Sequence, residues 1–265
     1  MELLTACQYR LLKAISPGEP AVCSGEAFKG KSKLEVLLGR ELVCSAVGKS
    51  VIDFGCGEGL EAIELARIGA KKVIGLDIRE SVLQTARSNA RSAGVANICE
   101  FGTSTTQQAD LIFSVDAFEH FEDPADILRI MDSLLAPGGE VVVSFGPTWY
   151  HPLGGHLFSV FPWAHLLFSE KALIRWRSDF KTDGATRFGE VAGGLNQITI
   201  RKFEQIVAAS PFQVKMLECV PIRKLAPIHG RLTREFTTAI VRCRLAKGCR
   251  SEAKVQDFNE ARAEL

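Results

Sequence analysis

Short apolar runs and longer helical patterns alternate along most of the chain. Five apolar runs have the length and composition of buried strands: residues 51–54, 72–77, 95–101, 110–115 and 140–145. Three intervening stretches carry apolar side chains at helical spacing: residues 60–70, 79–93 and 124–135. Such alternation predicts βαβ units and a parallel sheet with helices on both faces.

The pattern changes after the fifth apolar run. A helix is predicted at 199–209, followed by strands at 212–220 and 236–245 that a basic, proline-containing connection joins. Residues 1–49 carry amphipathic helical patterns that precede the first predicted strand, and no site is assigned to them. Residues 246–265 alternate charges and predict an exposed helix or a frayed tail. The predicted domain therefore spans 50–245.

Residues 146–197 are the least regular part of that domain. They contain three of the five histidines, all three tryptophans and many glycines and prolines. The segment leaves the carboxyl end of the fifth predicted strand, where ligands bind in parallel α/β sheets. A long irregular insert in a compact domain is usually a lid or a binding loop. We therefore expect a lid that overhangs the active site.

Residues 51–59, Val-Ile-Asp-Phe-Gly-Cys-Gly-Glu-Gly, join a strand to a helix through three glycines. Glycines permit tight turns and close ligand approach, and a helix start offers unpaired N–H groups. A dinucleotide loop needs Gly-x-Gly-x-x-Gly, which is one residue longer between the last two glycines. Asp53 would repel a pyrophosphate but suits an ammonium group. A purely structural βα turn is the alternative for this loop taken alone.

A second carboxylate narrows the ligand class. Asp77 ends the second predicted strand, where an acidic residue reaches ribose hydroxyls in doubly wound sheets. The chain thus combines a nucleoside-binding acid with a loop that does not fit a pyrophosphate. A nucleoside that carries an amino acid satisfies both conditions, and S-adenosylmethionine is such a molecule.

Four ordered motifs carry a family resemblance. They are residues 51–59, Gly-Leu-Asp-Ile at 75–78, Ser-Val-Asp-Ala-Phe-Glu-His at 114–120, and Leu-Leu-Ala-Pro-Gly-Gly-Glu-Val-Val-Val at 134–143. In order and spacing they resemble class I S-adenosylmethionine-dependent methyltransferases. The nearest subgroup acts on small molecules and includes enzymes of the ubiquinone-biosynthesis type. The resemblance covers about residues 51–145 and is specific for the cofactor, not for the substrate.

The resemblance implies a fold and a set of cofactor contacts. The fold is a doubly wound, Rossmann-like α/β sheet of seven mostly parallel strands in the order 3-2-1-4-5-7-6, with the lid inserted after strand 5. Asp53 and the glycine loop would hold the methionine part, and Asp77 the ribose. Thr103 and Ser104 stand where family members often have an acid that meets the adenine amino group. The predicted cofactor-binding residues are Asp53, Gly55, Cys56, Gly57, Gly59, Asp77, Ile78, Gly102, Thr103 and Ser114.

The insert supplies the predicted acceptor side. Its large apolar groups predict a largely apolar acceptor, and the residues expected to bind it are Trp149, Tyr150, His151, Phe158 and Trp163. A hydroxyl acceptor would need a base; His156 is the first candidate and His120 a weaker one. Hydrogen-bonded loop histidines are the plainer alternative. The histidine spacing matches no helical zinc motif, so no metal site is predicted.

Composition restricts the partners. With 32 basic and 31 acidic residues among 265, the net charge is +1, which disfavours a nucleic-acid substrate. None of the eight cysteines forms Cys-x-x-Cys, which favours buried free thiols in a reducing cytoplasm. We expect neither a signal peptide nor a membrane span. The prediction is therefore a cytoplasmic methyltransferase that acts on a small molecule.

Three other functions remain open at this point. A nicotinamide dehydrogenase shares the sheet but requires the longer glycine spacing. A non-catalytic cofactor-binding protein would keep the cofactor site and lack an acceptor cavity. A membrane-associated enzyme for a lipophilic, quinone-like or lipid-like acceptor would touch the bilayer peripherally through the apolar insert.

Overall fold

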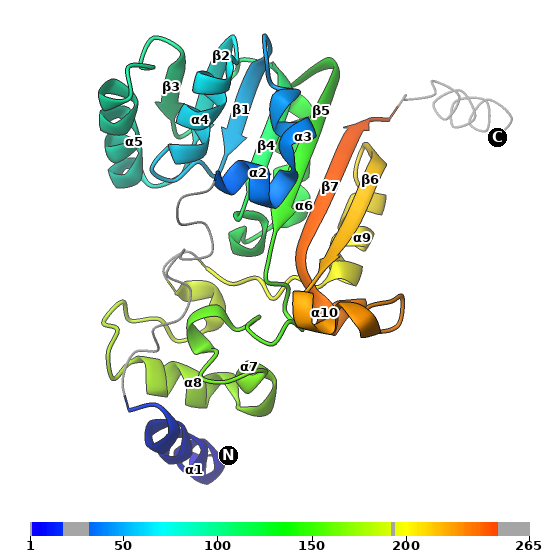
Figure 1. Ribbon diagram of the computed structural model, residues 1–265. Coiled ribbons are helices and arrows are strands. Elements are labelled where there is room, and N and C mark those ends of the chain that lie inside the picture. Colours follow the sequence, from blue (N-terminus) through cyan, green and yellow to red (C-terminus); the bar gives the residue numbers. More distant parts are fainter. Residues whose placement is uncertain (1, 18–31, 192–193, 249–265) are drawn as a thin grey trace, which may run out of the picture.

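A seven-stranded sheet forms the centre of the computed structural model, which describes residues 2–17, 32–191 and 194–248 (Figure 1). The strand order is β3-β2-β1-β4-β5-β7-β6. The strands are β1 (Ser50–Phe54), β2 (Lys72–Leu76), β3 (Cys99–Gly102), β4 (Ala109–Val115), β5 (Leu135–Phe145), β6 (Phe212–Pro221) and β7 (Thr238–Lys247). The first five pair in parallel, and β7 is antiparallel to both β5 and β6. This is the predicted doubly wound fold and strand order.

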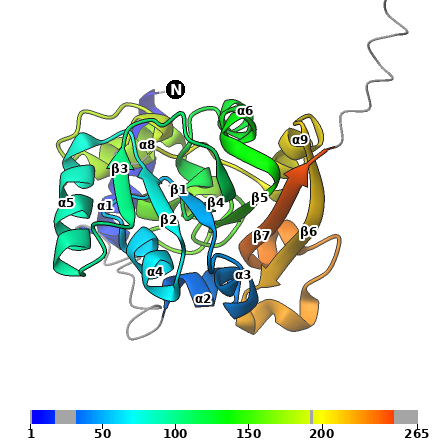
Figure 2. The ribbon, with the colours of Figure 1, turned by 90° about the horizontal axis from the view of Figure 1, so that it is seen from above.

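Helices cover both faces of the sheet, as Figure 2 shows from above. One face carries α2 (Lys33–Leu38), α3 (Arg40–Cys44), α4 (Leu60–Ile68) and α5 (Glu80–Ser92), and the other carries α6 (Pro124–Leu134) and α9 (Ile200–Ala208). Neighbouring strand residues point to opposite faces: Val51 packs among the first helices and Ile52 among the second. Both are fully buried, so an unbroken apolar run here reflects a doubly covered strand.

Three element boundaries differ from the prediction. The third strand begins only at Cys99, because residues 95–98 form a turn in which Val95 accepts backbone bonds from Ile98 and Cys99. Residues 137–139, expected to separate helix from strand, belong to the long β5. Residues 236–237, expected as strand, end the short helix α10 (Arg234–Thr237). Apolar composition alone does not separate such turns from strand ends.

The insert forms a lid with a hydrophobic cluster of its own. Its helical segments are η3 (His156–Phe158), α7 (Ala164–Leu167), α8 (Glu170–Arg177) and η4 (Phe188–Glu190). Phe158, Leu173, Trp176 and Phe188 are buried together in this cluster, separately from the two clusters that line the sheet. The lid lies beyond the carboxyl ends of the parallel strands (Figure 1). The expected position of the insert is therefore the observed one.

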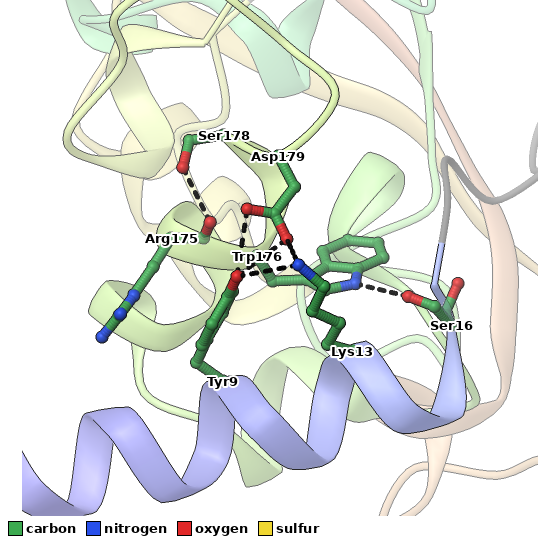
Figure 3. Close-up of polar contacts among 7 residues, drawn as sticks. All are labelled: Tyr9, Lys13, Ser16, Arg175, Trp176, Ser178 and Asp179. Carbon is green, nitrogen blue, oxygen red and sulfur yellow. Dashed lines mark hydrogen bonds and ion pairs between the residues drawn. The ribbon is translucent and has the colours of Figure 1, made fainter.

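The first helix packs on the lid and not beside the first strand. In α1 (Glu2–Ile15), Leu12 is fully buried in the lid cluster. Asp179 accepts hydrogen bonds from the Tyr9 hydroxyl at 2.9 and 3.1 Å and pairs with Lys13 at 3.2 Å. The Trp176 indole donates to the Ser16 carbonyl at 2.8 Å, and Figure 3 shows these contacts between α1 and α8. Only α2 and α3 fit the expected role beside β1.

Candidate active site

Asp53 ends the buried part of β1 at the edge of the sheet that faces the lid. Its side chain is 2% exposed, and Oδ2 has no hydrogen-bond partner among the described residues. Burial, with Glu61 nearby, raises the pKa of Asp53 to about 8. An unpaired buried carboxyl is costly, and a bound cation would stabilise its ionised form.

Lys33 is a site residue that the sequence analysis did not find. Standing at the first position of α2, it forms ion pairs of 3.1 Å with both Glu61, from α4, and Asp116, which follows β4. The Lys33 ammonium group therefore links α4 to the segment that follows β4, near Asp53. Lys33 lies far from the glycine loop in sequence, and no local motif marks it. It is suited to bind the carboxylate of a ligand whose ammonium group meets the acidic residues.

Four amides of the glycine loop are already hydrogen-bonded within the chain. Gly55 and Cys56 both donate to the Leu76 carbonyl, at 2.8 and 2.9 Å, and Gly59 donates to Cys56. Gly57 donates to the Asp77 carboxylate at 3.0 Å. A pyrophosphate needs free N–H donors, whereas an ammonium group needs acceptors such as loop carbonyls. The loop geometry therefore favours the ammonium ligand.

Two glycines of this loop are required by space as well as by backbone conformation. Gly55 and Gly59 have positive φ values of 86° and 77°. A Cβ atom would lie 2.7 Å from Ala117 at the first and 2.7 Å from the Phe101 ring at the second. At Gly57, also with positive φ, a Cβ atom would meet nothing within 4 Å. Gly57 therefore faces open space that a ligand can occupy.

Asp77 is a bound carboxylate and not a free one. It accepts from the Gly57 amide, the Arg79 amide at 2.9 Å and the Arg79 guanidinium at 3.0 and 3.1 Å. Burial raises the pKa of Asp77, but the bonds from Arg79 outweigh it and leave the pKa below its usual value. The carboxylate stays ionised. Ribose hydroxyls would therefore share Asp77 with Arg79.

The remaining predicted cofactor residues fall into two groups. Ile78 is 90% exposed, and Thr103 is also exposed at the end of β3 beside Gly102, so this side is open to an adenine ring. By contrast, Cys56 and Ser114 are buried, at 3% and 0% exposed. Any contact of these two with a cofactor would need their backbone or a local rearrangement.

The two candidate bases lie side by side. The rings of His120 and His156 are 5.4 Å apart, with interplanar angle 65°. His120 Nδ1 donates to the Gly194 carbonyl at 2.9 Å, which leaves its Nε2 as an acceptor. His156 Nε2 is buried without a partner among the described residues. Burial, with His120 nearby, lowers the pKa of His156 to about 4, so this ring is neutral.

Glu119, which precedes His120 in the chain, is also unusual. It is 2% exposed, accepts from the Gly146 amide at 3.4 Å, and has no partner for Oε2 among the described residues. Burial, with Asp116 nearby, raises the pKa of Glu119 to about 8. A protonated acid, Glu119, thus lies next in the chain to His120, whose ring contacts the neutral imidazole of His156.

The predicted acceptor residues do not form one surface. Trp163 donates its indole N–H to the Tyr150 carbonyl at 2.9 Å, and the Tyr150 ring lies 5.2 Å from Phe236. Trp149 packs on His165, with ring centroids 4.7 Å apart. His151 accepts from the Leu153 amide and is half-buried.

Phe158 has a different environment. It is 1% exposed within the lid cluster and packs against Phe188, with ring centroids 4.7 Å apart. Its environment is that of a core residue, so acceptor binding by Phe158 has no support in this packing.

In residues 2–17, 32–191 and 194–248, no three or more His, Cys, Asp and Glu side chains gather as a metal site would require.

A family model described as a methyltransferase domain matches residues 45–147. The chain carries a class I S-adenosylmethionine-dependent methyltransferase domain. The matched region contains β1 to β5 and all the predicted cofactor-binding residues, but neither Lys33 nor most of the lid. The predicted family, fold and cofactor are therefore confirmed.

Curated relatives match the same part of the chain. A ribosomal protein L11 methyltransferase of Vibrio campbellii is 42% identical over 98 residues, 37% of this chain and 33% of its own length. A ubiquinone biosynthesis O-methyltransferase of Acinetobacter baylyi is 38% identical over 104 residues, 37% of this chain and 43% of its own. The chain thus matches less than half the length of either relative. These relatives differ in acceptor, so the match does not identify one.

One solved structure extends the likeness in fold. An S-adenosylmethionine dependent methyltransferase from Mesorhizobium loti has a TM-score of 0.53 with this chain at 19% identity, over 82% of this chain and 99% of its own. At this identity the likeness concerns the fold alone.

The residues of the methyltransferase domain fit the cofactor. Asp53 Oδ2 and the loop carbonyls suit its ammonium group, and Lys33 suits its carboxylate. Asp77 suits the ribose and the exposed Ile78 the adenine. When bound, S-adenosylmethionine supplies an activated methyl group on a sulfonium.

Proposed function

We propose that this chain transfers the methyl group of S-adenosylmethionine to a small, largely apolar acceptor, with a hydroxyl as the preferred methylated group. The observation that carries this proposal is the meeting of His120 and His156. His120 follows the fourth strand of the methyltransferase domain, and His156 belongs to the lid. A neutral imidazole from the lid therefore lies at the crevice edge.

The roles of the chain's own residues follow from this arrangement. Asp53, Lys33 and Asp77 would fix the cofactor, and the lid would align the acceptor oxygen with the methyl group. Alignment accounts for much of the acceleration when the leaving group is already activated. The unpartnered His156 Nε2 would take the hydroxyl proton. Its low pKa suits an acidic hydroxyl, such as a phenol, better than an aliphatic alcohol.

A protein acceptor is the second candidate, because the Vibrio campbellii relative is named for ribosomal protein L11. Two further alternatives are a membrane-associated enzyme for a lipophilic acceptor and a non-catalytic cofactor-binding protein. The lid favours a small acceptor, because its aromatic residues Trp149, Tyr150 and Trp163 are only partly buried and leave apolar surface for a small molecule. A flat protein surface would not require such a cover.

A screen with radiolabelled S-adenosylmethionine tests the proposal. The acceptors are a panel of phenols of increasing apolar size, aliphatic alcohols of matched size, and purified ribosomal protein L11. We expect label in the apolar phenols. Phe161 is a further aromatic residue of the lid, with its ring 5.9 Å from that of Phe168. The double variant Phe161→Glu with Trp163→Glu should give no labelled product and should still bind S-adenosylhomocysteine. Label in L11 alone would contradict the small-molecule acceptor, and no transfer to any acceptor would favour a non-catalytic role.

A further inference from the structure

The connection between β6 and β7, residues 222–237, has an unusual distribution of charge. It contains four basic residues and one acidic residue. Glu235 accepts the amides of Ile200 and Arg201 at 3.0 and 2.9 Å, so its charge faces the start of α9. Arg234 is paired with Glu204 at 2.6 Å. In the described part of the chain, no carboxylate pairs with the exposed side chains of Arg223, Lys224 and Arg231.

Large apolar side chains project from the same connection. Leu232 is 96% exposed, Ile228 60% and Phe236 45%. A single exposed leucine is ordinary, but three large apolar groups among unpaired cations within 16 residues are not. Burying them would be favourable only against an apolar partner.

The connection is held in shape by its own hydrogen bonds. The Ile222 amide donates to the Thr237 carbonyl at 2.8 Å, and the His229 ring bonds the Thr237 hydroxyl at 2.7 Å. The Thr233 hydroxyl donates to the Ile228 carbonyl at 2.6 Å and accepts from the Gly230 amide at 3.0 Å. Ile228 and Leu232 are therefore presented by an ordered backbone.

The connection borders the acceptor side of the molecule. Figure 1 shows α10 at the end of the sheet that faces the lid. Phe236 packs against Tyr150, which follows the fifth strand at the start of the lid. A surface that docked here would lie beside the proposed acceptor entrance.

We propose that the β6–β7 connection docks on an anionic lipid bilayer. Arg223, Lys224 and Arg231 pair with lipid headgroups, and Ile228 and Leu232 insert among the acyl chains. This combination of cations with apolar tips is what interfacial binding requires. A nucleic acid would use the cations but leave the apolar tips unburied. The proposal does not depend on methyl transfer, so the two can fail separately.

Co-sedimentation of the full chain with vesicles tests this surface. The vesicles contain neutral phosphatidylcholine alone or with one third phosphatidylglycerol, without cofactor or acceptor. We expect retention on the anionic vesicles only, and weaker retention as salt increases. The triple variant Arg223→Glu, Lys224→Glu, Arg231→Glu should lower the partition coefficient on the order of 100-fold, from roughly five-fold per removed cation.

A net-charge control separates the surface from the overall charge. The variant Arg67→Glu, Lys71→Glu, Arg91→Glu changes the charge equally, at exposed positions beside the amino ends of the strands, and should keep wild-type retention. Ile228→Ser with Leu232→Ser should reduce retention at least ten-fold, and Val47→Ser, at a 55% exposed site, should not. Binding of S-adenosylhomocysteine reports that each variant is folded.

Three results would overturn the proposal. The first is no retention of the wild-type chain on anionic vesicles. The second is equal loss of retention in the two charge variants. The third is that the wild-type chain binds duplex or single-stranded RNA but no vesicles, and that the triple variant no longer binds the RNA. That result would assign the connection to a nucleic acid.

Discussion

Burial shifts the pKa values of three side chains in this site, Asp53, Glu119 and His156. Asp53 and Glu119 are held protonated up to about pH 8, while His156 stays neutral down to about pH 4. Removal from water disfavours the charged form in each case. Asp53, Glu119 and His156 are thus close to neutral near pH 7, and a cationic cofactor would favour the ionised form of Asp53.

Glu119 should make folding depend on pH. Between its ordinary pKa of 4.5 and the raised value of about 8, the folded chain keeps a proton that the unfolded chain loses. The free energy of unfolding therefore falls as pH rises through this window, by up to about 1.4 kcal/mol per unit. Glu119→Gln should make this slope less steep in urea unfolding between pH 5 and 8, while Asp53, whose pKa is also raised, still contributes to it.

The neighbouring exposed Glu122 provides the control for this experiment. Glu122→Gln should keep the wild-type slope. Identical slopes for wild type and Glu119→Gln would show that Glu119 is not held protonated in the folded chain.

His156→Ala should lower turnover of a hydroxyl acceptor by about 100-fold or more, the usual contribution of a general base. Affinity for S-adenosylhomocysteine should stay within two-fold of wild type, since no predicted cofactor residue is altered. His229→Ala, which removes a histidine outside the lid, should leave turnover unchanged. Turnover that survives in His156→Ala would remove this residue from the mechanism.

At the scale of elements, the lid is built from two distant parts of the chain. α1 supplies Leu12, Tyr9 and Lys13 to α8, and the Arg175 guanidinium lies 4.4 Å from the Tyr9 ring centre. The apolar pattern of α1 is visible in the sequence, but its partner is not, because nothing local distinguishes packing on β1 from packing on α8. The insert itself is recognisable from its irregular composition.

Leu12→Ala should loosen the lid without loosening the sheet. Truncating a fully buried leucine costs about 2–5 kcal/mol, and here the loss falls on the lid cluster. Amide hydrogen exchange should accelerate in α1 and α8 and stay unchanged in β1, β4 and β5. Leu11→Ala, at a position 53% exposed on the same helix, should have little effect. Equal acceleration in lid and sheet would show one cooperative unit instead.

For the whole molecule, periodicity predicted the alternation of strands and helices, and irregular composition predicted the lid. The family resemblance that four motifs carry implied the sheet order and supported the cofactor. These features depend on local patterns that repeat wherever this fold is built. The contacts of Lys33 could not be predicted in this way, because they join side chains from distant parts of the chain. The Arg79–Asp77 pair is local, but no periodicity or motif marks it. The helical part of the β6–β7 connection was missed because α10 is one turn long, too short to show a clear periodicity.

In the part of the chain that the structure describes, no helix combines the length and the apolar character that crossing a bilayer demands.

The central claim is that the crevice binds S-adenosylmethionine through Asp53, Lys33 and Asp77. Titration calorimetry with S-adenosylhomocysteine and with NAD measures it most directly, on wild type and on Asp77→Ala. We expect saturable binding of S-adenosylhomocysteine at one site and none of NAD. Asp77→Ala should bind more than ten-fold more weakly, because charge-assisted bonds to ribose contribute about 1.5–3 kcal/mol. Binding of NAD without binding of S-adenosylhomocysteine, or unchanged affinity in folded Asp77→Ala, would contradict the claim.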